Sequence, residues 1–137
     1  MLCDAALPLQ RQMIIQLESN VELQTEMQGK FKIGDQTDIG VHFPRIVLGD
    51  TRAFVWQSAT FDGQEHEIQL VLWNVSGGSD KAKSIAAVII GELHNADFPI
   101  AGHALVDMQF EKSETRYMKC IKGYQTILHF KSLTVSD

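Results

Sequence analysis

The run from His66 to Val75 carries apolar side chains in a pattern that restricts the folds open to this chain. Alternate residues of an extended strand point to opposite faces. One face of this run would carry Ile68, Leu70 and Leu72, and the other would carry Val71, Trp73 and Val75. A strand that is apolar on both faces must be covered on both. We therefore expect it at the centre of a sheet, or with one face against another subunit.

Further extended segments flank this run on both sides. An Asp62-Gly63 turn, a strong hairpin signal, connects it to the segments before it. Two of those segments are separated by a turn or bulge at Gly49-Asp50, and the two that follow alternate apolar and polar residues. The expected strands are Pro44–Leu48, Arg52–Gln57, His66–Val75, Ala104–Glu111 with an extension toward Cys120, and Tyr124–Val135.

Two segments show helical periodicity. Residues 4–19 place an apolar stripe at spacings of four, with Asp4 as the expected N-cap. A short helical turn is expected after Asn20, at residues 21–28. Residues 81–94 form a second amphipathic helix after a Ser79 or Asp80 cap. We interpret Gly29–Val41 as a long loop or loose hairpin with a short exposed strand at Phe31 and Ile33.

These elements follow the order α-β-β-β-α-β-β. The order predicts an α+β fold, with an antiparallel or mixed sheet of about five strands and two main helices on one face. All 137 residues fit one domain, 1–137.

Charge argues against sequence-specific binding of DNA or RNA. Twelve basic and seventeen acidic side chains give a net charge of -5, whereas nucleic-acid binders usually carry a basic excess on one face. The densest basic stretch, Lys112 to Lys122, is interrupted by Glu114 and is interpreted as a solvated strand face.

Targeting and redox signals are also missing. Met1 to Ala6 does not resemble a signal peptide, and the longest apolar run, Ile85 to Ile90, is too short to cross a bilayer. Cys3 and Cys120 form no disulfide or metal pattern and are expected as reduced thiols. We therefore expect synthesis in the cytoplasm and no membrane association.

No motif predicts catalysis, a cofactor or a metal site. The Gly77–Lys81 segment lacks the spacing of a phosphate-binding loop, and its Asp80 would repel a phosphate. The five histidines show no metal-ligand spacing, and in Glu65-His66-Glu67 the histidine points away from both carboxylates. A small enzyme using His66, Glu92 or His94 is the weakest alternative.

Four segments together resemble a family of small tail proteins of siphophages, prophages and gene transfer agents. The first is Phe43–Asp50, which resembles the "fPyvvlGd" segment of that family, although Arg45 replaces a common aromatic residue. The others are a strand signature, an alanine- and isoleucine-rich helix, and a glycine-tyrosine step before the last strand. They match at Gly63, Glu65, His66 and Trp73, at Lys81–His94, and at Gly123-Tyr124.

The resemblance implies a tail completion, or tail terminator, protein. Such proteins form a ring, usually a hexamer, at the head-proximal end of the tail tube. The implied partners are further copies of the chain, the tail tube protein and a head-tail connector or stopper protein, with DNA only as passing cargo. The implied location is the virion tail, and no catalytic residue or cofactor is implied. A small adaptor protein acting as a monomer or dimer is the alternative.

We hypothesise that the loops Gly29–Val41 and Ser76–Asp80, with nearby strand residues, contact neighbouring subunits or tail partners. The candidate interface residues are Phe31, Ile33, Asp35, Asp38, Arg45, Trp73, Gly77, Gly78 and Asp80.

Overall fold

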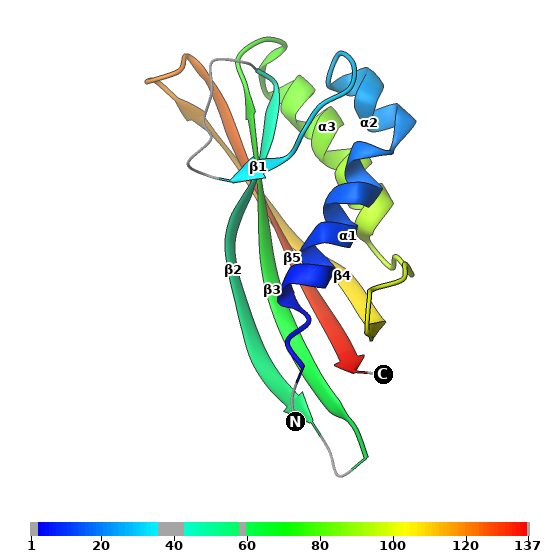
Figure 1. Ribbon diagram of the computed structural model, residues 1–137. Helices are drawn as coiled ribbons and strands as arrows, with labels where there is room; N and C mark the ends of the chain where they lie inside the picture. The colour runs from blue at the N-terminus through cyan, green and yellow to red at the C-terminus, as the bar shows by residue number, and fades with distance from the viewer. Residues whose placement is uncertain (1–2, 36–42, 58–59, 137) are drawn as a thin grey trace.

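The computed structural model describes residues 3–35, 43–57 and 60–136. The fold is α+β, with three helices packed beside one long, twisted sheet (Figure 1). The helices are α1 Ala6–Glu18, α2 Val21–Glu26 and α3 Gly78–Leu93, and the strands are β1 Gly34–Asp35, β2 Arg45–Gln57, β3 Asp62–Asn74, β4 His103–Met118 and β5 Gly123–Ser136.

The sheet has the strand order β1-β2-β3-β5-β4, so β3 lies at its centre as predicted. Four long strands pair antiparallel, and the two-residue β1 pairs parallel with β2 at Val47 and Leu48. The sheet has about the expected number of strands, but one expected division between strands is corrected. Pro44–Leu48 and Arg52–Gln57 belong to the single strand β2, because the irregularity between Leu48 and Thr51 is a bulge that leaves pairing with β3 intact on both sides.

The hydrophobic core lies between the helices and one face of the sheet (Figure 1). The helix face of the central strand supplies Ile68, Leu70 and Leu72, as its alternation predicts. Helix α3 runs across the sheet and buries one stripe against it. The buried side chains of that stripe are Ala82, Ile85, Ala86, Ile89 and Leu93. The opposite face of the sheet carries no described helix.

The segment before α1 is attached to the central strand. Gln64 of β3 accepts a hydrogen bond from Ala5 N at 2.7 Å and donates one to Asp4 Oδ1 at 3.1 Å. Asp4 Oδ1 also accepts from Ala6 N at 3.0 Å. Asp4 was expected as the N-cap; the helix begins at Ala6 with Ala5 as its cap residue. The Ala6 hydrogen bond, with Gln64 next, lowers the pKa of Asp4.

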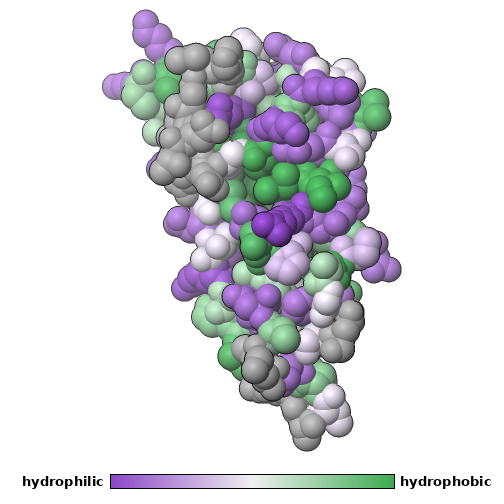
Figure 2. Space-filling model, in the orientation of Figure 1, coloured by the Kyte–Doolittle hydropathy of each residue, from purple (hydrophilic) through white to green (hydrophobic). Residues whose placement is uncertain are grey.

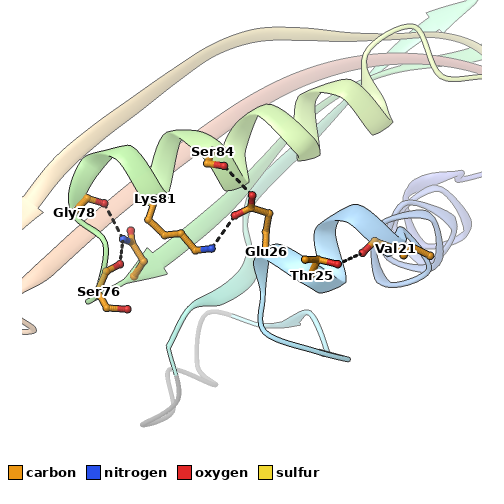
Figure 3. A network of polar contacts seen from close by, with 8 residues as sticks. Val21, Thr25, Glu26, Ser76, Gly78, Lys81 and Ser84 are labelled. Carbon is orange, nitrogen blue, oxygen red and sulfur yellow. Dashed lines mark hydrogen bonds and ion pairs between the residues drawn. The ribbon is translucent and has the colours of Figure 1, made fainter.

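Helix α2 is joined to α3 by a short polar network (Figure 3). Glu26 accepts from Lys81 Nζ at 2.8 Å and from Ser84 Oγ at 2.9 Å, and these bonds lower its pKa. At the other end of α2, Asn20 Oδ1 caps the helix by accepting from Leu23 N at 2.8 Å. The prediction of a short helical turn after Asn20 is thus confirmed, and it makes a third helix.

The start of α3 differs from the expected serine or aspartate cap. Gly77 occupies the N-cap position with a φ of 83°, a left-handed conformation that favours glycine, and no side chain caps the helix. The buried Asn74 instead steadies this turn, because its Nδ2 donates to Ser76 O at 3.3 Å and to Gly78 O at 3.1 Å (Figure 3).

Candidate assembly interface

Several of the predicted interface residues lie at one end of the sheet. Arg45, the first residue of β2, pairs with Trp73 near the end of β3, and β1 pairs with β2 two residues further along. Helix α3 begins at the same end, immediately after the β3–α3 turn (Figure 1). Trp73 is half-buried, and its indole N–H is buried without an acceptor among the described residues. Such an unsatisfied donor is uncommon in a folded protein.

Two of the predicted residues are less exposed than expected. Ile33 is 9% exposed and belongs to the hydrophobic core, and Phe31 packs against that core. The backbone of Ile33 is fixed by its N–H, which donates to Glu18 Oε2 at 2.9 Å. The expected exposed strand at Phe31 and Ile33 is therefore wrong, and the strand of this segment is β1, which starts at Gly34.

The remaining predicted residues lie in or beside the loops. Asp35 is in β1, where it pairs with Leu48, and Asp38 lies outside the described residues. Gly77 and Gly78 are exposed in the β3–α3 turn with φ values of 83° and 64°. Asp80 is exposed in the first turn of α3, where a carboxylate interacts favourably with the helix dipole.

The residues considered for catalysis do not converge. His66 is buried on the helix face, with Nε2 3.0 Å from Thr134 Oγ1, and burial lowers its pKa. Glu92 accepts from Asn20 Nδ2 at 2.6 Å, and His94 Nδ1 accepts from Phe110 N at 3.0 Å. Each of the three therefore contacts a structural partner on a different element. Their positions give the proposed enzyme alternative no assembled site.

The described residues contain neither a metal-binding cluster nor a helix that could cross a membrane. Within ranges 3–35, 43–57 and 60–136, no group of three or more histidine, cysteine, aspartate or glutamate side chains is placed to hold a metal ion. The helices of that part of the chain are also too short or too polar to span a membrane.

The sheet face opposite the helices carries charges of both signs. Lys131 Nζ lies 2.9 Å from Glu65 Oε1, and this hydrogen bond raises the pKa of Lys131. Arg52 forms an ion pair with Glu67 at 2.5 Å. Alternating charges of this kind do not form the continuous basic track that DNA phosphates would favour.

The exposed apolar hairpin formed by β2 and β3 was not predicted from the sequence. The β2–β3 hairpin extends beyond the helices (Figure 1), and it leaves Phe54, Val55 and Trp56 exposed at 42%, 62% and 36%. The Trp56 ring packs on Phe61 at a centroid distance of 5.1 Å. The exposure of Trp56 favours a contact with another protein over a place in the core. The run of three apolar residues at 54–56, close to a turn, is the sequence signal that could have identified this surface.

A second exposed surface lies at the opposite edge of the sheet. Edge strand β4 and helix α3 border a groove whose floor includes Ala87, Ile90 and Tyr124. Tyr117 stands at its rim, 54% exposed, in edge-to-face contact with Tyr124 at 5.5 Å. In the view of Figure 2, which shows the side of the helices, apolar side chains are visible only in limited areas among polar ones. The exposed Tyr117 and the adjoining groove make this edge a second candidate contact surface.

Comparison with known proteins agrees with this arrangement. The sequence matches the family model described as "Tail completion protein gp17" over residues 11–134. A chain of a solved structure titled "Virion of native gene transfer agent (GTA) particle" shares the fold, with a TM-score of 0.85 at 20% identity, covering 96% of this chain and 98% of that one. A comparison with curated proteins gives no match. The chain therefore belongs to the tail completion protein gp17 family and is a structural tail-completion protein.

Proposed function

We propose that copies of this chain form a closed ring, a hexamer, that caps the head-proximal end of a tail tube. The ring joins the tube to the head-tail connector or stopper protein and leaves a channel for DNA. The observation that carries the proposal is the family match, which spans almost the whole chain. The likeness to a chain of a gene transfer agent virion supports the same fold and a similar kind of particle.

Two exposed surfaces of the chain support a ring. A ring needs two different surfaces on each subunit, so that each copy contacts the next head to tail. The exposed β2–β3 hairpin and the α3–β4 groove lie at opposite edges of the sheet and are two such surfaces. The loops at the start of β2 and of α3 remain our candidates for contacts with the tube or connector. Deleting either loop is expected to impair docking.

The charge suits a channel through which DNA passes without binding. The net charge of -5 would repel phosphates, and the charges on the open sheet face are mixed in sign. We propose that acidic side chains line the channel. A ring structure with a strongly basic channel would contradict this part of the proposal.

Purified full-length protein provides the test, alone and mixed with the tail tube protein and the connector proteins. Negative-stain microscopy should show six-fold rings, and light scattering should give the mass of six chains in at least one mixture. A protein that stays monomeric or dimeric and binds neither partner would overturn the proposal. That result would favour the small adaptor protein instead.

A further inference from the structure

We propose that the outer edge of β2, at residues 53–57, pairs with the outer edge of β4, at residues 113–117, of the next copy. The two sheets then become one continuous sheet across each subunit contact. This inference rests on the proposed ring and specifies which surfaces form it.

The β2 edge at residues 53–57 is open in the described structure. β1 pairs with β2 only at Val47 and Leu48, so the hairpin half of β2 has a described strand on one side alone. Residues 51–56 are all exposed, and three of them are the large apolar residues Phe54, Val55 and Trp56. An apolar strand with an unpaired edge is a template for pairing with another chain.

The β4 edge is open over a matching length. β4 is the last strand of the sheet and pairs with β5 alone. Both of its irregularities precede Ser113, and residues 113–118 then pair with β5 in unbroken register. Residues 113–117 are exposed except for Thr115, which is half-buried. The bulges and charges before this stretch limit pairing elsewhere along β4, so residues 113–117 are its available segment.

Pairing of these two edges would place Val55 of one copy over the α3–β4 groove of the next copy. Val55 pairs with Gln64 within its own sheet, whose side chain faces the helices, so Val55 also lies on the helix face. On β4, Ser113 and Thr115 lie on the helix face and line the α3–β4 groove. A continuous sheet therefore directs Val55 toward the groove of the next copy, where small side chains leave room for it.

The other face and the charges are also complementary. Phe54 and Trp56 point away from the helices, as does Arg116 of β4, which pairs with Gln125. In the joined sheet these aromatic rings meet the Arg116 guanidinium, a favourable cation–π arrangement. The hairpin, residues 51–67, carries three carboxylates and one arginine, whereas the described charged residues of the groove are Lys83 and Arg116. Glu114 of the same β4 segment lies on the other face, where it forms an ion pair with Lys112.

Cross-linking between copies tests this pairing directly. In a background where the exposed Cys3 and Cys120 are replaced by serine, one full-length variant carries Val55→Cys and another carries Ser113→Cys. The two are mixed with tail tube protein, allowed to assemble and treated with a short bismaleimide. Val21→Cys, at a position 74% exposed on α2, replaces Val55→Cys in the matched control. Far-ultraviolet circular dichroism verifies that each variant is folded.

We expect covalent dimers containing one copy of each variant, at least tenfold more than in the Val21→Cys control. Microscopy of the same samples separates the two proposals. Rings without the 55–113 cross-link overturn the strand pairing and leave the ring intact. Open chains with that cross-link support the pairing and overturn the ring. Samples with neither rings nor the cross-link overturn both.

Discussion

Replacing Gly123 by alanine should destabilise the protein substantially. Gly123 begins β5, packed against the end of β3, and a Cβ built there would overlap Asn74 O and lie 2.9 Å from Val75 Cα. Both are backbone atoms, so no flexible side chain can move aside. The two strands must separate or tilt at the point where Asn74 holds the start of α3.

The magnitude follows from these contacts. Overpacking of a well-packed site costs about 1–3 kcal/mol, and a clash with backbone belongs near the upper end. Alanine also lowers the conformational entropy of the unfolded chain relative to glycine, and this offsets roughly 0.5 kcal/mol of the cost. We expect a net loss of about 2–2.5 kcal/mol in the free energy of unfolding, or a melting temperature roughly 5–10 °C lower.

Gly91→Ala is the matched control, because the chemical change is identical. Gly91 lies inside α3 with no atom within 4 Å of an added Cβ. Alanine there should stabilise the helix by about 1 kcal/mol. Urea unfolding of both variants measures the contrast. A Gly123→Ala protein as stable as the parent would refute the steric reasoning, whatever the control shows.

Two further predictions concern the buried His66 and the half-buried Asn20. Burial lowers the pKa of His66, so the unfolded chain takes up the proton more readily, and stability should fall as the pH drops below about 6.5. His66→Gln should flatten the fall in urea midpoint between neutral and mildly acidic pH; an unchanged slope would contradict this assignment. Asn20→Ala should cost about 1–2 kcal/mol by removing the α2 cap and a partner of Glu92. Asn20→Ser should retain most of the cap without placing a second carboxylate beside Glu92, and equal losses in both variants would argue against this assignment.

The sequence predicted those elements whose pattern is local. The two apolar faces of β3 identified it as a central strand, and the stripe at Ile85 and Ile89 identified the buried side of α3. The Gly49-Asp50 signal could not show that β2 is continuous, because its continuity depends on pairing with residues of β3 that follow later in the chain.

The interface was harder to predict for a similar reason. Phe54 and Trp56 are residue types common in hydrophobic cores, but they lie on the sheet face that no described helix covers, and this leaves them exposed. Ile33 shows the opposite error. Its neighbours are lysines, yet Glu18 of α1 holds its backbone and the core covers its side chain. In both cases the exposure is set by distant elements.

The position of β5 in the sheet has a consequence for synthesis on the ribosome. β5 is the last strand along the chain, yet it lies between β3 and β4 and pairs with both. Until residues 123–136 have emerged, the nascent chain has two strands without their shared neighbour and a half-covered apolar face. Completion of the sheet is thus a late, long-range event, of the kind that slows folding and exposes intermediates to aggregation. Chains released early would lack β5 and so leave β4 without its partner strand. Such chains would not form the complete sheet and could not enter an assembling particle.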